Sequence, residues 1–245
     1  MNAARQSPTD SHDSQTDTIL LQQWGVQFFV LAQAELWLPV LRDGTWEQGQ
    51  RAYFIPTALS LGCDLFIDIG ANNGIYTLLM ANESQIKHIV AFEPCEPHFS
   101  LLRRSVALNG CASKCELHRI ACSDENDVKP MYVFSNATPS LNQFVETKIE
   151  SDERIKSLGA RIERIHACRL DDKIAHKGRR IAIKIDTEGH EIAVIRGAER
   201  LFRDNDCFLQ IESFGLDITT EMKALGYQHV NSIKHDHYFA KPPVV

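Results

Sequence analysis

The sequence has no apolar run near the roughly 18 consecutive residues that a helix needs to span a bilayer, so we predict no membrane-spanning segment. The amino-terminal residues 1–18 are polar and lack the cationic stretch followed by an apolar one that is typical of a secretory signal peptide. We therefore expect residues 1–18 to form a disordered leader and the protein to be cytoplasmic.

The seven cysteines include no C-x-x-C pair. Cys111 and Cys115 are four positions apart, and no second pair completes a zinc site with them. This usage favours reduced thiols in a cytoplasmic protein, and no metal site is predicted from the cysteines.

Basic residues are not in excess: 26 Lys and Arg stand against 32 Asp and Glu, for a formal net charge of −6. A nucleic-acid partner usually requires a basic face, so we predict none. A local basic patch for such a partner is left open by Arg161, Arg164 and Arg169. A solvated charged surface explains these arginines more simply. The oligomeric state is not readable from these data.

From Leu65 onward, apolar strand-like runs alternate with helical segments, which predicts an α/β fold with a parallel sheet and right-handed βαβ connections. The expected strands are Leu65–Asp68, His88–Phe92, Cys115–Arg119, Ile181–Ile185 and Cys207–Ile211. The expected helices are Ile75–Asn82, His98–Asn109 and Glu191–Phe202. A terminal hairpin is expected over Tyr227–Ala240.

Two regions depart from this alternation. Residues 19–61 are expected to be an extension that packs on the core; Trp46–Leu61 looks helical, and the rest fits either strands or helices. Residues 62–245 would form the main domain, with an excursion near 131–170 that faces the substrate. Within that excursion we expect a strand over Met131–Phe134 and allow a helix over Glu146–Arg164.

The segment Asp68–Gly74 follows a buried strand and opens a helix, which indicates a ligand site at the carboxyl end of the sheet. Its glycines, Gly70 and Gly74, permit close backbone approach. The dinucleotide fingerprint requires a glycine where this chain has Asn72, and the acidic Asp68 disfavours an anionic pyrophosphate. A ligand that bears an amino group fits better, and S-adenosylmethionine carries both an ammonium and a sulfonium.

Acidic residues follow the next two strands. Glu93 ends its strand and is placed to accept hydrogen bonds from both ribose hydroxyls of a nucleoside. Asp124 and Ser123 are rival candidates to bind the adenine amino group, and a plain turn explains them equally well.

Ionisable residues are densest in the segment Lys184–Glu191. Asp186, Glu188 and His190 are candidates to orient a substrate hydroxyl or remove its proton, and Lys184 to pair with a carboxylate or lie near the reacting oxygen. Three close carboxylates are compatible with a bound divalent metal ion but do not require one. A helix amino terminus rich in acidic residues is the alternative.

Three ordered blocks of this chain resemble the FkbM-type S-adenosylmethionine-dependent methyltransferases. The matching blocks are Phe66–Thr77, Ala91–Phe99 with Leu102 and Asn109, and Ile183–Glu191 continuing to Leu201, followed by Leu209–Glu212. The resemblance covers roughly residues 62–215.

That resemblance implies a class I methyltransferase fold, a doubly wound seven-stranded sheet with its last strand antiparallel. It also implies O-methylation of a small-molecule, sugar or glycan hydroxyl. By position, Asp68, Gly70, Asn72 and Gly74 would hold the methionine part of the cofactor, Glu93 its ribose, and Asp186 the junction with the acceptor. N-methylation, a nucleotide-dependent oxidoreductase and a non-catalytic protein on the same fold remain as alternatives.

Overall fold

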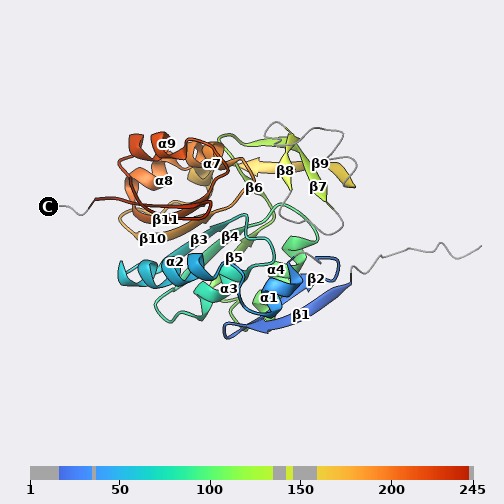
Figure 1. Cartoon of the computed structure of the whole chain (residues 1–245). Helices are drawn as coiled ribbons and strands as arrows, with labels where there is room; N and C mark the ends of the chain where they lie inside the picture. Colours follow the sequence, from blue (N-terminus) through green and yellow to red (C-terminus); the bar gives the residue numbers. More distant parts are fainter. Residues whose placement is uncertain (1–16, 35–36, 135–141, 146–158, 243–245) are drawn as a thin grey trace, which may run out of the picture.

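The computed structural model describes residues 17–34, 37–134, 142–145 and 159–242 (Figure 1). Almost all of the leader predicted over residues 1–18 lies outside the described residues, as does much of the excursion near 131–170. Within the described part of the chain, no helix combines the length and the apolar character needed to cross a membrane.

A seven-stranded sheet forms the centre of the molecule, in the order β5-β4-β3-β10-β11-β13-β12. Its strands are β3 (Leu65–Ile69), β4 (His88–Phe92), β5 (Cys115–His118), β10 (Arg180–Ile185), β11 (Asp206–Glu212), β12 (Gln228–Ile233) and β13 (Asp236–Ala240). β13 lies antiparallel between β11 and β12, and the other pairs of neighbours within β5–β11 are parallel. The predicted doubly wound sheet with an antiparallel last strand is confirmed.

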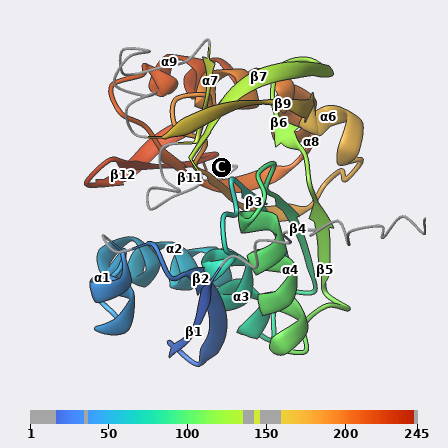
Figure 2. The ribbon, with the colours of Figure 1, turned by 90° about the vertical axis from the view of Figure 1, so that its right-hand side faces the viewer.

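Helices cover both faces of this sheet (Figures 1 and 2). One layer contains α2 (Gln48–Ser60), α3 (Ile75–Asn82) and α4 (His98–Leu108), and the other contains α7 (Glu191–Gly197), α8 (Glu199–Asp204) and α9 (Ile218–Ala224). Alternate residues of one strand serve the two layers: Ile67 packs with the α7–α9 side and Phe66 with the α2–α3 side. Burial on both faces explains why β3 is apolar at nearly every position.

The predicted helix over Glu191–Phe202 is wrong in one respect, because it is interrupted at Ala198, between α7 and α8. The last residue of α7 packs closely on another segment at this point, since a Cβ on Gly197 would lie 1.9 Å from the carbonyl oxygen of Ser123. Periodicity alone does not reveal such a contact with a distant loop.

A second sheet rises above the carboxyl edge of the first, in the order β6-β9-β7-β8 (Figure 2). Its strands are β6 (Ala121–Cys122), β7 (Asp127–Phe134), β8 (Gln143–Phe144) and β9 (Ala160–Cys168), and the short helix α6 (Leu170–Lys173) follows β9. The helix expected over Glu146–Arg164 is wrong for Ala160–Arg164, which pairs antiparallel with β7. Residues 146–158 of that expectation lie outside the described residues.

The amino-terminal extension packs against the helical layer that contains α4. Its elements are β1 (Thr18–Gln23), β2 (Val26–Leu31), α1 (Leu38–Arg42) and the helix α2. Side chains of α4 bind the exposed edge of β2: Ser105 Oγ accepts from the backbone N–H of Phe29 at 3.0 Å, and Asn109 Oδ1 accepts from that of Gln27 at 3.0 Å. The extension is thereby fixed beside the carboxyl ends of the central strands.

Candidate functional site

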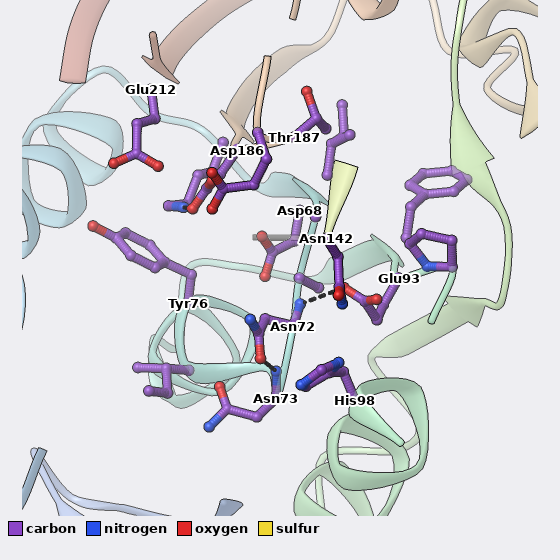
Figure 3. A pocket seen from close by; sticks show the side chains of 18 of the residues that line it. Asp68, Asn72, Asn73, Tyr76, Glu93, His98, Asn142, Asp186, Thr187 and Glu212 are labelled. Atoms are coloured by element: carbon purple, nitrogen blue, oxygen red, sulfur yellow. Dashed lines mark hydrogen bonds and ion pairs between the residues drawn. The ribbon is translucent and has the colours of Figure 1, made fainter. Parts of the chain in front are cut away.

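A cavity of about 350 Å³ lies at the carboxyl ends of β3, β4 and β10 (Figure 3). This edge is where ligands bind in open parallel sheets. The predicted residues that line it are Asp68, Gly70, Asn72, Glu93, Lys184, Asp186 and Glu188. The motifs that are separated in the sequence therefore meet at one site.

The turn after β3 folds with three left-handed residues: Gly70 at φ 78°, Asn72 at φ 52° and Gly74 at φ 89°. Asn tolerates this conformation better than most residues. A Cβ on Gly70 would lie 1.8 Å from the backbone carbonyl oxygen of Asp186, and one on Gly74 would lie 2.5 Å from Leu102 Cδ1. Both glycines are thus required by contacts within the protein, whereas the sequence suggested contact with a ligand.

Glu93 ties this turn to the end of β4. Its Oε2 accepts from the backbone N–H of Asn72 at 2.9 Å, and its Oε1 accepts from that of Cys95 at 2.9 Å (Figure 3). Burial raises the pKa of Glu93 to about 7, and the two backbone hydrogen bonds oppose the rise only in part. The carboxyl group is buried against the protein yet still lines the cavity.

Asp68 points from β3 toward the same space, where its Oδ2 accepts from Thr77 Oγ1 at 2.6 Å. Burial raises the pKa of Asp68 to about 6, opposed by the charge of Lys184 and by Thr77. The cavity floor therefore carries acidic groups on both sides of the glycine turn.

Lys184 and Asp186 form a buried ion pair at the end of β10, with Lys184 Nζ 2.6 Å from Asp186 Oδ2. Burial opposes ionisation of both groups, but their mutual attraction prevails. The pKa of Lys184 is raised well above its ordinary value and that of Asp186 is lowered. The ammonium also lies 4.9 Å from the centre of the Tyr76 ring. Asp186 is consequently a weak base at neutral pH.

Glu188 and Glu212 complete a group of three carboxyls with Asp186, and one oxygen atom from each lies within 4.8 Å of the others. Burial and the charge of Asp186 raise the pKa of Glu188 to about 9 and that of Glu212 to about 10. Oxygen ligands of this kind suit a hard divalent cation. Lys184 already balances the charge of Asp186, however, so the group is complete without a metal.

Ser123, Asp124 and His190 are brought together outside the cavity lining. Ser123 Oγ lies 2.9 Å from His190 Nε2 and 3.1 Å from Asp124 Oδ1, and the ring of Phe144 lies against that of His190. These contacts join the loop after β6 to the start of α7. The adenine role of Ser123 and Asp124 and the acid–base role of His190 stay predictions.

Part of the cavity lining comes from residues that the motifs did not include. Trp37 and Trp46 come from the amino-terminal extension, and Phe214 follows β11. Trp37 and Phe214 keep 36% and 50% of their surface exposed, so they lie at the rim of the cavity. Glu47, next to Trp46, also lines the cavity. In the sequence, the apolar character of the tryptophans was the one signal that they could line a cavity. No sequence motif included Glu47.

His98, the first residue of α4, lines the cavity beside the turn and Glu93 (Figure 3). It is 2% exposed, and its Nε2 has no hydrogen-bond partner among the described residues. Burial lowers the pKa of His98 to about 4, so the ring is neutral at physiological pH. A buried polar atom left unpaired costs free energy unless a ligand satisfies it.

These features fit S-adenosylmethionine. Glu93 offers carboxylate oxygens for a ribose diol, His98 an unsatisfied ring nitrogen, and Asp68 a carboxyl group for an ammonium. The same cavity is also lined by the aromatic residues Trp37, Trp46 and Phe214, which the cofactor motifs do not include.

Comparison with known proteins gives a consistent result. A sequence model described as the methyltransferase FkbM domain matches residues 68–229. A curated relative, "Methyltransferase 1" of Beauveria bassiana (strain ARSEF 2860), is 24% identical over 144 residues, which are 54% of this chain and 57% of that protein. The chain thus matches little more than half the length of that relative.

Solved structures with similar folds include a methyltransferase FkbM from Methylobacillus flagellatus KT. Its TM-score is 0.48 at 17% identity, over 73% of this chain and 43% of that one. Another is M. jannaschii TYW2 in complex with AdoMet, with a TM-score of 0.42 at 12% identity, over 91% of this chain and 83% of that one.

Proposed function

Because the chain belongs to the FkbM methyltransferase family, we propose that it transfers the methyl group of S-adenosylmethionine to a hydroxyl oxygen of a small molecule, sugar or glycan. The family match confirms the predicted family and gives the domain its reaction class, S-adenosylmethionine-dependent methyl transfer. The assignment of a hydroxyl group as the acceptor goes beyond what the family match gives. The observation that carries it is the meeting of Glu93 and the carboxyls after β10 in one cavity.

The assignment of cofactor contacts follows from the cavity walls. Asp68, Gly70 and Asn72 would hold the methionine part, and Glu93 would accept from the ribose hydroxyls; Gly74, which does not line the cavity, would only shape the turn through its close contact with Leu102. The unpartnered ring nitrogen of His98 would form a hydrogen bond with the nucleoside part of the cofactor in the same cavity. When bound, S-adenosylmethionine supplies an electrophilic methyl group on a positively charged sulfur.

The protein's task is then to align an acceptor oxygen and to receive its proton. Asp186 and Glu188 line the same cavity as the cofactor motifs and the aromatic residues, which supports a role in orienting the acceptor hydroxyl. An amine acceptor would have less need of nearby carboxyls. The abundance of carboxyl groups therefore favours O-methylation over N-methylation.

The test is methyl transfer to matched alcohol and amine versions of one acceptor scaffold, with binding of S-adenosylhomocysteine measured by calorimetry. We expect binding of S-adenosylhomocysteine and turnover of the alcohol. Faster turnover of the amine would replace our proposal with N-methylation, and failure to bind the cofactor product would favour a non-catalytic protein.

The cysteines support one more proposal, a reducing cytoplasmic location. All seven are free thiols, and five of them are buried. Cys122 and Cys168 are directly paired in register on β6 and β9 and still carry no disulfide. A thiol titration of protein taken directly from cells tests this proposal, and a disulfide found there would contradict it.

A further inference from the structure

Glu47 places a carboxyl group in the cavity from outside the region that the family model matches. Its Oε2 accepts from the hydroxyl group of Tyr76 at 2.8 Å. Among the described residues this is the one hydrogen bond found for the Glu47 side chain, and it leaves Oε1 uninvolved. One oxygen is thus held in position while the other remains available to a ligand, which is how a proton acceptor is usually arranged.

The backbone at Glu47 is held in an unusual conformation, with φ 43° and ψ 37° at the amino terminus of α2. A left-handed glutamate costs free energy and tends to persist where the surrounding structure enforces it. Here Arg51 enforces it: its Nε donates to the carbonyl of Trp46 at 2.8 Å, and its guanidinium stacks 3.9 Å from the centre of the Trp24 ring.

Aromatic packing fixes the same segment from the other side. The Trp46 ring lies edge-on to that of Tyr76 with 5.9 Å between centroids, and 6.2 Å from that of Trp24. Tyr76 belongs to α3, directly after the glycine turn. Glu47 is therefore held firmly in the wall of the cavity that the cofactor motifs also line, although it precedes them in the sequence.

The other acidic groups of the cavity are less suited to accept a proton. Asp186 is neutralised by Lys184 at 2.6 Å. Glu188 and Glu212 crowd Asp186 and hold protons at neutral pH, because burial and the charge of Asp186 raise their pKa values. His190 is turned toward Ser123 and does not line the cavity.

We propose that Glu47 is the general base of the methyl transfer. In that step Oε1 of Glu47 takes the proton of the acceptor hydroxyl, while the oxygen forms a bond to the methyl carbon. The methyl–sulfur bond breaks and its electron pair stays on sulfur; the proton then passes to water. This inference rests on the proposed O-methylation and adds the residue that makes it possible.

The ionisation behaviour of Glu47 agrees with this role. Burial raises its pKa to about 7, which suits a base at neutral pH. The charged groups that act on it are Lys184, Asp186 and Asp236, and Arg51 of its own helix lies nearby. Lys184 and the Tyr76 hydrogen bond lower this pKa, whereas the two aspartates raise it.

The experiment compares the full-length wild type with Glu47→Gln, Tyr76→Phe and the exposed control Glu116→Gln. Turnover is followed with methyl-labelled S-adenosylmethionine on methyl glycosides and simple phenols, as a function of pH. Binding of S-adenosylhomocysteine is measured by calorimetry. The carboxyl signals of glutamate are titrated by carbon NMR in wild type and Glu47→Gln.

We expect Glu47→Gln to lower kcat about 100-fold or more, with KM changed only a few-fold. The acidic limb of the pH–rate profile should disappear. S-adenosylhomocysteine affinity should stay within about threefold, and a glutamate signal that titrates near pH 7 should be missing. Tyr76→Phe should keep most of the plateau kcat and move the acidic limb to higher pH, since it removes a hydrogen bond that lowers the pKa of Glu47.

Three results would overturn the inference. The first is a wild-type kcat in Glu47→Gln, and the second is a titration midpoint below pH 5 for the Glu47 carboxyl signal. The third is a large loss of S-adenosylhomocysteine affinity in Glu47→Gln, because Glu47 would then be a cofactor ligand. If the wild type binds S-adenosylhomocysteine and methylates none of the hydroxyl acceptors but does methylate amines, the proposed O-methylation itself fails. The two failures are thereby distinguishable.

Discussion

Gly70 lies so close to the backbone carbonyl of Asp186 that a Cβ in its place would be 1.8 Å from that oxygen. The glycine turn and the ionisable cluster after β10 are therefore in direct backbone contact. A side chain at Gly70 would push apart the two motifs on which the site depends.

We predict that Gly70→Ala destabilises the protein by about 3 kcal/mol or more, because a left-handed alanine is strained and the clash is with rigid backbone. Gly178→Ala is the matched control: it also has a positive φ but meets nothing within 4 Å, so we expect a loss of about 1 kcal/mol. Urea denaturation measures both. Equal losses in the two variants would contradict the close contact.

Replacing Lys184 with Met should lower the free energy of unfolding by about 3–5 kcal/mol, because it leaves Asp186 buried among carboxyls without a counter-ion. Arg203→Met serves as the control. It breaks the exposed pair with Glu199, and we expect a change of less than about 1 kcal/mol. The measurement is thermal and denaturant unfolding. Partial recovery in Lys184→Met with Asp186→Asn would identify the unpaired charge as the cause.

His98→Ala should weaken S-adenosylhomocysteine binding about tenfold, the value of one hydrogen bond of roughly 1.4 kcal/mol. The reason is that the neutral His98 ring lines the cavity with an unpartnered Nε2. Isothermal calorimetry gives the affinity. His166→Ala, at an exposed position of β9, is the control and should bind as the wild type does. An unchanged affinity in His98→Ala would remove this residue from the cofactor site.

The pH dependence of stability tests Glu93. Its pKa in the folded protein is about 7, against an ordinary value of 4.5, so the folded state binds this proton more tightly than the unfolded chain does. The resulting stabilisation is present at low pH and is lost as the pH rises from about 4.5 to 7. Over this pH interval we expect the free energy of unfolding to fall by up to ~3 kcal/mol more in the wild type than in Glu93→Gln.

Denaturant titrations of ligand-free protein at pH 4.5, 6 and 8 measure that difference. Asp206→Asn, which changes an exposed carboxylate at the start of β11, should keep the wild-type dependence on pH. Parallel curves for the wild type and Glu93→Gln would show that Glu93 ionises as it does in the unfolded chain.

Local patterns predicted the part of the site that is local in sequence. Strand β3, the turn and helix α3 are consecutive, so glycine positions and apolar runs define them directly. The same holds for Glu93 after β4 and Asp186 after β10. Because parallel strands end at one edge of a sheet, the sequence also indicated that these residues meet.

The remaining features depend on contacts between distant segments. Glu47 is held at the cavity by its hydrogen bond to Tyr76, which is distant in the sequence. The extension that carries Glu47 matched no recognised sequence pattern. His98 looked like an ordinary first residue of a helix, and only its burial beside Glu93 marks it. Ser123 and His190 were separate candidates for the cavity, yet their side chains bond to each other.

The position of β13 between β11 and β12 has a consequence for folding. Asp236 at its start accepts from Gln210 on β11 at 2.7 Å and from Gln50 on α2 at 3.2 Å, and Gln210 in turn donates to Tyr76 at 3.1 Å. The support behind Tyr76 and Glu47 is thus assembled only when β13 has inserted between β11 and β12. A chain that terminates before Asp236 would carry every recognised motif and still lack a completed active site.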